Sequence, residues 1–244
     1  MLPLILFVFS TSLSFTTSSW ALPGKEKDPM INPGMFEGDM LGVSRSKDRN
    51  AVPLDSQRWP GGEIPYIIKE SVDANTRKAL KAGMDHISSK TCIKFVERKD
   101  ERDYVEVFKG NGCYSHWGRI GGVQSVSLGN GCSDIGTVVH ELLHAVGFEH
   151  EHNRSDRDDY LKINWQNILP GYEDSFEPLM PHEERRLTDF DFDSVMLYGS
   201  YAFSKEPFFL KTMEALNGRE MPEVYYKKGL SSDDIKRVKL LYDC

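Results

Sequence analysis

Short stretches in which hydrophobic and polar residues alternate occur along the first half of the chain, and this alternation predicts β-strands. Three of them are Glu63–Ile68, residues 92–96 and Tyr104–Phe108. Two further short strands are expected between Cys113 and Cys132. The pattern therefore predicts one twisted sheet in this half of the chain.

Apolar residues at helical spacing predict three helices. The first covers residues 73–88, with Asp73 near its start. The second begins in the apolar run at Val138. The last opens where Ser231 and Asp234 have the spacing of a capping box. Two long helices are thus expected beside the sheet, and one near the end of the chain.

The segment between the second and the last helix has little regular periodicity. Residues 161–190 contain three prolines and only short helical pieces, so this half is expected to be rich in loops. The prediction is an α+β fold. It has a twisted, mainly antiparallel-edged sheet with two long helices in the N-terminal half, and a loop-rich C-terminal half with a final helix.

One predicted strand has a further interpretation. Val123–Leu128 precedes the second helix, and we expect it at an edge of the sheet. An extended peptide can pair with such an edge through main-chain hydrogen bonds.

The second predicted helix carries a metal-binding pattern. His140 and His144 share one helix face and can bind one ion, and Glu141 beside them can reach a water on that ion. Gly147 stands where the helix must end, because glycine adopts the left-handed conformation without a Cβ penalty. His150 then supplies a third nitrogen. Three neutral imidazoles and a water form the open tetrahedral arrangement of catalytic zinc.

Composition narrows the class of protein. The chain has 244 residues, enough for one large domain or two small ones. Its net charge of −7 argues against a nucleic-acid partner, because phosphate binding requires clustered Lys and Arg. Four cysteines suit two disulfides if the chain is exported, in any of three pairings.

The start of the sequence has features of an export signal. An apolar run over residues 2–9 is followed by a Ser/Thr-rich segment, and small residues at Ser19 and Ala21 suit signal peptidase. We therefore expect a signal peptide over residues 1–21 and a secreted, extracellular protein. A membrane anchor is the competing interpretation, but the run is too short to span a bilayer.

Residues 22–49 are rich in Pro, Gly and charged residues, which is typical of a linker or of a propeptide. The bond between Arg49 and Asn50 suits a trypsin-like activating protease. Asp39 follows a flexible glycine and could occupy the open zinc position. These features favour a propeptide, followed by a catalytic domain over residues 50–244.

Two later features have two interpretations each. Asn153 begins a glycosylation sequon within a charged stretch, which is either glycosylated or held against the cleft. Met196 lies in an apolar run that would normally be core. After a zinc-binding helix, however, the same run fits the hydrophobic floor of a metal site.

The chain resembles the astacin family of metzincin zinc endopeptidases in three short motifs. The matching runs are HELLHAVGFEHE at 140–151, SVMLY at 194–198 and FEGD at 36–39. The resemblance covers most of residues 50–244. A local departure is YYKKGL at 225–230, where relatives more commonly carry GQRxGL.

The resemblance implies a metzincin fold with the active-site cleft between the two halves. It implies one Zn²⁺ per subunit held by His140, His144 and His150, with Glu141 as general base. Tyr198 would be an additional zinc ligand at rest that moves to stabilise the oxyanion.

The resemblance also assigns supporting roles. Met196 would form the turn beneath the zinc, and Asp39 would hold the zinc in the zymogen. After activation, the new amino terminus at Asn50 would be buried near Glu151. The family disulfide pattern implies the pairs Cys92–Cys244 and Cys113–Cys132.

The expected function is that of a secreted, monomeric zinc endopeptidase made as a zymogen and acting on protein or peptide substrates. One alternative is a catalytically inactive binding protein on the same fold, but Glu141 and the three histidines are all present. Another is a zinc enzyme of a different class, against which Met196 and Tyr198 argue.

Overall fold

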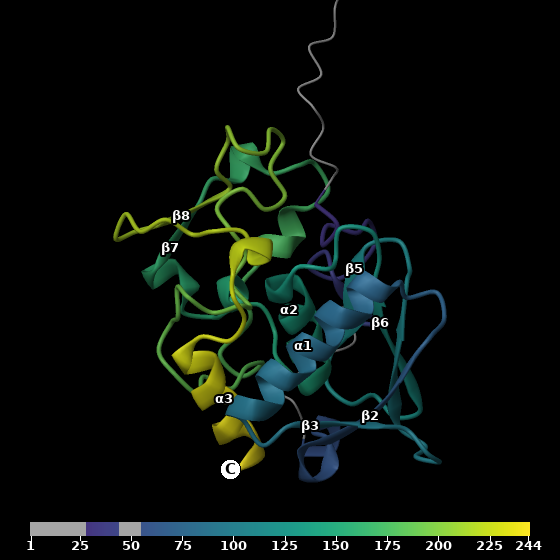
Figure 1. The fold of residues 1–244 in the computed structure, drawn as a ribbon. Helices are drawn as coiled ribbons and strands as arrows, with labels where there is room; N and C mark the ends of the chain where they lie inside the picture. Colours follow the sequence, from purple (N-terminus) through teal and green to yellow (C-terminus); the bar gives the residue numbers. More distant parts are fainter. Residues whose placement is uncertain (1–27, 44–54) are drawn as a thin grey trace, which may run out of the picture.

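The computed structural model describes residues 28–43 and 55–244 (Figure 1). The predicted signal peptide over 1–21 and the predicted cleavage site at Arg49 and Asn50 lie outside these ranges. Within them, no helix is both long enough and apolar enough to cross a bilayer.

Six strands form one mixed sheet in the order β1-β5-β6-β4-β2-β3. Four of its five strand pairs are parallel, and the antiparallel pair is β5 with β6. The alternating stretches of the sequence all contribute strands to it. The strands are β1 (Met40–Leu41), β2 (Glu63–Ile68), β3 (Lys94–Glu97), β4 (Tyr104–Phe108), β5 (Cys113–His116) and β6 (Val123–Leu128).

The prediction that Val123–Leu128 lies at an edge of the sheet is wrong. This strand, β6, pairs with β4 on one side and with β5 on the other. The strand next to the edge is β5, and its outer side is covered by β1, which comes from the N-terminal segment. Periodicity identifies a strand but not its neighbours, because pairing depends on long-range contacts.

Two helices pack together against the sheet, α1 (Ala74–Lys90) and α2 (Ile135–Val146). Asp73 caps α1 as expected, its side chain accepting a hydrogen bond from the Thr76 amide (2.9 Å). The helices approach closely at Gly83, where a Cβ would lie 2.7 Å from Cγ1 of Val138. Every residue of α2 after the first is buried, so its polar side chains face the protein interior.

The C-terminal half consists mostly of loops and short 3₁₀ turns, as predicted. It contains a two-stranded antiparallel sheet of β7 (Leu161–Ile163) and β8 (Met213–Ala215), and the final helix α3 (Ser232–Tyr242). Ser231 and Asp234 form the predicted capping box at the start of α3. Figure 1 shows this half, in green to yellow, beside the half that contains the sheet.

Two disulfides join distant parts of the chain, Cys92–Cys244 and Cys113–Cys132, as the family resemblance implied. The first links the segment after α1 to the segment after α3. The second links β5 to the segment before α2.

Replacing Cys92 and Cys244 together by alanine should lower the free energy of unfolding by about 2–5 kcal/mol. The matched control is the Cys113→Ala/Cys132→Ala pair. The chain separation is 152 residues in the first disulfide and 19 in the second, so loop-closure entropy predicts that losing the first costs about 2 kcal/mol more. Urea denaturation of both variants measures the difference. An equal or reversed order would contradict this explanation.

Candidate metal centre and active site

Helix α2 and the turn after it bring three histidines together. His140 and His144 lie one helical turn apart on α2, and both are fully buried. Gly147 ends the helix with a φ of 125°, and its amide donates to the Leu143 carbonyl (3.0 Å). The chain then reverses, so the buried His150 reaches the other two from a different direction.

Each histidine ring is oriented by an oxygen acceptor at Nδ1. The acceptor is the Val195 carbonyl for His140 (2.8 Å) and the Phe148 carbonyl for His144 (2.7 Å). His150 instead contacts the Glu37 carboxylate (2.8 Å). With Nδ1–H donating in all three rings, the Nε2 lone pairs are left to face the centre of the cluster.

The arrangement of the Nε2 atoms fits a bound cation. Nε2 of His140 lies 3.1 Å from Nε2 of His144, and two lone pairs at that distance cannot bond to each other. The Asp39 carboxylate completes the set, 3.1 Å from His140, 3.3 Å from His144 and 3.2 Å from His150. Among residues 28–43 and 55–244, these are the only clustered side chains of this kind able to share an ion. Three imidazoles and one carboxylate are a suitable donor set for Zn²⁺.

Asp39 arrives from the N-terminal segment and closes the site. The two residues that follow it form β1, and its own carbonyl accepts a hydrogen bond from the Ser115 amide (2.9 Å) on β5. Gly38 must be small, since a Cβ there would lie 2.8 Å from the Phe203 ring. Burial acts to raise the pKa of Asp39, but His150 and His144 outweigh it and lower that pKa well below its usual range.

Tyr198 lies directly over this cluster. Its hydroxyl donates to the Asp39 carboxylate (2.5 Å), and its ring stacks on His150 with the centroids 4.5 Å apart. Burial, followed by the charge of Asp39, raises the pKa of Tyr198 well above its usual value. The phenol therefore stays protonated and able to donate.

Glu141 is a fully buried carboxylate with no hydrogen-bond partner at either oxygen among the described residues. Burial first, and then the charge of Asp39, raises its pKa well above the usual range. An orphaned buried carboxylate beside a metal cluster is suited to accepting a proton from a water or substrate placed there.

The run that contains Met196 forms a buried turn beside His140. Within this turn, the Val195 amide donates to the Asp234 carboxylate on α3 (2.8 Å). The buried side chain of Lys227 donates to the carbonyls of Ser194 (2.7 Å) and Leu197 (2.5 Å). Met196 itself is fully buried. The final helix and the segment before it thus hold the turn in place, and Lys227 lies in the run that departs from the family pattern.

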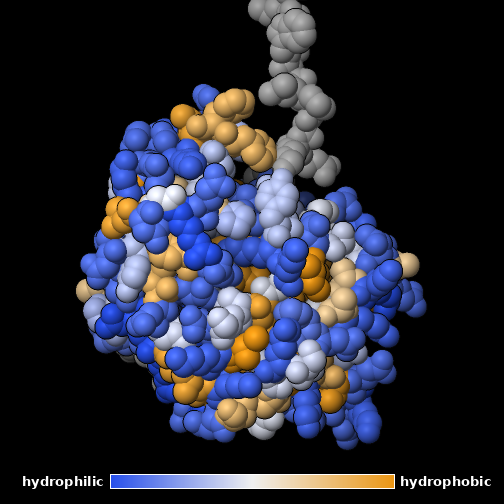
Figure 2. Space-filling view, turned by 60° about the vertical axis from the view of Figure 1, so that its left-hand side comes forward, coloured by the Kyte–Doolittle hydropathy of each residue, from blue (hydrophilic) through white to orange (hydrophobic). Residues whose placement is uncertain are grey.

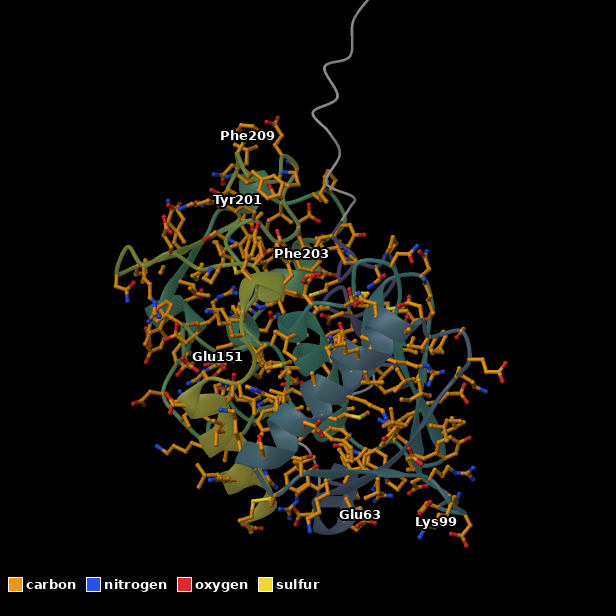
Figure 3. The ribbon with its side chains drawn as sticks, in the orientation of Figure 1. Glu63, Lys99, Glu151, Tyr201, Phe203 and Phe209 are labelled. Carbon is orange, nitrogen blue, oxygen red and sulfur yellow. A yellow bond between two sulfur atoms is a disulfide. The ribbon has the colours of Figure 1, made fainter. Side chains whose placement is uncertain are left out.

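Glu151 lies in a buried ionic cluster beside α3 (Figure 3). Its carboxylate accepts from Arg154 (3.0 Å), from Arg237 and from the Asp191 amide (2.8 Å). Sequence reasoning identified Glu151 but not the two arginines. Arg237 is 86 residues away in the chain and belongs to no local motif.

Glu37 is a third residue of the site that the sequence analysis missed. Besides holding His150, this buried carboxylate accepts from the Asn153 amide (2.9 Å). The N-terminal segment therefore contacts the metal cluster through two carboxylates, Asp39 directly and Glu37 through His150. Its place in the FEGD run was the available signal.

The side chain of Asn153 is buried, and its amide nitrogen is engaged in hydrogen bonds. It donates to Glu37 (2.9 Å) and to the carbonyls of Ser175 (3.1 Å) and Glu177 (2.9 Å). The nitrogen of the sequon asparagine is therefore held inside the fold, against the Glu37 carboxylate. We expect no glycan on Asn153 in folded protein secreted from a eukaryotic host, since a glycan would displace the buried hydrogen bonds that its nitrogen donates. Glycopeptide mass spectrometry checks this, and occupancy near completion would contradict it.

Comparisons with known proteins agree with this site. The model of the peptidase family described as Astacin matches residues 51–243. The chain is 45% identical over 225 residues to astacin-like metalloprotease toxin 1 of Loxosceles intermedia, a match that covers 89% of this chain and 84% of that protein. It is 51% identical over 159 residues to astacin-like metalloprotease toxin 5 of Loxosceles gaucho, covering 64% and 85% respectively.

A solved structure has a fold similar to that of this chain. High choriolytic enzyme 1, a hatching enzyme zinc-protease from Oryzias latipes, superposes with a TM-score of 0.68 at 35% sequence identity. The match covers 84% of this chain and 99% of that chain. The expected metzincin fold is thereby confirmed.

Proposed function

Because the chain belongs to the astacin family of zinc metalloendopeptidases, we propose that it is a secreted endopeptidase made as a zymogen, with Glu141 as its general base. In this proposal residues 1–21 are the signal peptide, 22–49 the propeptide and 50–244 the catalytic domain. The observation that carries it is the convergence of three histidine Nε2 atoms and the Asp39 carboxylate on one point.

The residues around the metal cluster would each have a separate role in catalysis. When bound, zinc polarises the scissile carbonyl and lowers the pKa of a water. Glu141 takes the proton of the attacking water and delivers it to the leaving amine. Tyr198 donates a hydrogen bond to the oxygen on which negative charge develops, a contribution of a few kcal/mol at most. His140, His144 and His150 hold the metal, and their Nδ1 partners keep the rings oriented.

The position of Asp39 would keep the uncleaved zymogen inactive. Its carboxylate occupies the open side of the histidine cluster and also engages the hydroxyl of Tyr198. A substrate carbonyl would need the same place. The segment is held there by main-chain hydrogen bonds from Cys113 to Pro29 (2.8 Å) and from Ser115 to Asp39 (2.9 Å).

Activation would occur by cleavage between Arg49 and Asn50 by a trypsin-like protease. A cavity of about 70 Å³ beside Glu151, lined also by Arg154, Arg237 and Trp117, offers a place for the new amino terminus. We propose that Asn50 enters it and that its ammonium group contacts Glu151.

Export and a monomeric state complete the proposal. Two disulfides are typical of proteins that fold in an oxidising compartment. Every side chain placed around the metal cluster comes from one chain, so a single copy suffices for the site.

The activation step is tested with purified full-length zymogen treated with trypsin. We expect gelatin cleavage to appear together with a new amino terminus at Asn50. Arg49→Gln is the matched control, because it removes the trypsin site and leaves the metal cluster intact. Equal activation of the Arg49→Gln protein would contradict the proposed cleavage site.

A further inference from the structure

A tight turn in the N-terminal segment brings two carboxylates to the metal cluster. Phe36 and Met40 pair through two main-chain hydrogen bonds of 3.0 Å, so only residues 37–39 lie between them. Asp39 contacts the three histidines, and Glu37 contacts Nδ1 of His150 (2.8 Å). Both carboxylates therefore reach the cluster from one turn, but only Asp39 lies among the Nε2 atoms.

The acidic side chain of Glu37 lies in the interior. Figure 2 shows that hydrophilic side chains cover most of one face of the protein, whereas Glu37 is only 3% exposed. Its Oε2 accepts from Nδ1 of His150 (2.8 Å), and its Oε1 accepts from Nδ2 of Asn153 (2.9 Å). Burial of a carboxyl group is unfavourable unless such contacts replace the water that it loses. Glu37 is thus a specific acceptor for these two donors.

The backbone of Glu37 is held in an unfavourable conformation. Its φ is 50°, in the left-handed region that favours glycine. Such a conformation persists only where surrounding contacts hold it, and it is frequent at functional sites. One of these contacts comes from the site itself, since the Tyr198 hydroxyl donates to the Glu37 carbonyl (3.3 Å). The main chain and the side chain of Glu37 therefore both contact residues of the metal centre.

His150 differs from the other two histidines in the source of its orienting partner. The carbonyls of Val195 and Phe148 orient the rings of His140 and His144, and both belong to the proposed catalytic domain. The partner of His150 belongs to the proposed propeptide. A carboxylate that accepts from the outer N–H of a metal-binding histidine fixes the ring and makes the inner nitrogen a stronger donor. The orientation of this one ring therefore depends on the N-terminal segment.

We propose that Glu37 is a positioning residue of the zinc site in the zymogen, acting through His150 and in addition to the direct contact of Asp39. Zinc and the N-terminal segment then strengthen each other's binding, because a coupling free energy between two sites is reciprocal. The chain holds zinc most tightly before activation, and loss of the segment removes both carboxylates at once. This role rests on the proposed function only in that residues 22–49 must leave as a propeptide.

The role is tested by the dissociation constant for zinc of the purified, uncleaved protein, measured at constant pH by competition with a chromogenic chelator. We expect Glu37→Ala to raise this constant by about 10- to 100-fold. Glu37→Gln keeps the size of the side chain but offers one acceptor oxygen to two donors, so its constant should be intermediate.

Asp28→Asn is the matched control for both variants. It removes one carboxylate from the same segment, and the Asp28 side chain accepts from the Met30 amide (3.0 Å) and is not in the metal-binding group. We expect its dissociation constant for zinc to equal that of the unsubstituted protein.

Trypsin treatment distinguishes positioning from misfolding. Cleavage after Arg49 removes position 37, so all these proteins then have the same sequence, and their dissociation constants for zinc should become equal. A difference that survives cleavage would show a misfolded catalytic domain and would overturn the role of Glu37. An unchanged constant in the uncleaved Glu37→Ala or Glu37→Gln protein would also overturn it. If the unsubstituted protein binds no zinc before or after cleavage, it is the proposed function that fails.

Discussion

Glu141→Gln should lower peptide hydrolysis by the activated protein by about 10²-fold or more, with its zinc content unchanged. Glutamine has nearly the same volume as glutamate but cannot accept the proton of the attacking water. Glu141 is fully buried, and neither of its oxygens bonds to another described residue. The substitution therefore removes a proton acceptor without breaking a structural hydrogen bond.

The measurement is kcat/KM on a fluorogenic peptide, with zinc measured by atomic absorption on the same samples. Glu106→Gln is the control, a glutamate on β4 that pairs with Lys69 away from the metal cluster. We expect it to behave as the unsubstituted protein. Activity of Glu141→Gln within about threefold of that protein would mean that another group is the base.

Asp39→Ala should make the uncleaved chain active. Asp39 contacts all three histidines and Tyr198, and truncating one partner of such a buried charged group typically costs about 2–5 kcal/mol. The propeptide keeps its other contacts, including Glu37 with His150 (2.8 Å). We therefore expect peptidase activity before trypsin treatment to rise by about 10-fold or more.

This prediction is checked on Arg49→Gln protein, so that cleavage after Arg49 cannot account for the activity. Asp28→Asn serves as the control on the same segment, because the Asp28 side chain accepts a hydrogen bond from the Met30 amide (3.0 Å) and is not one of the four side chains grouped for metal binding. We expect Asp28→Asn to stay latent. A latent Asp39→Ala protein that binds zinc would show that the propeptide blocks the site by other contacts.

The local features of the fold and site could be predicted because short spacings determine them. The i, i+4 spacing of His140 and His144 puts both on one face of a helix, and Gly147 ends that helix at the place from which His150 can return. The caps at Asp73 and Ser231 are likewise local, and both are present.

The remaining features depend on contacts between residues far apart in the chain. The position of β6 inside the sheet follows from its pairing with β4 and β5, which periodicity cannot reveal. Glu151 pairs with Arg237, which lies 86 residues away in the chain. His150 pairs with Glu37, which lies 113 residues away. The disulfide pairing was available only from the family resemblance, because four cysteines allow three pairings.

In the proposed function, the histidine cluster holds a zinc ion that the chain uses to hydrolyse peptide bonds. The most direct measurement is gelatin cleavage by trypsin-activated protein before chelation, after 1,10-phenanthroline treatment and dialysis, and after zinc is restored. We expect cleavage, its loss on chelation and its recovery with about one zinc ion per chain. Cleavage that persists in the zinc-free protein would contradict it.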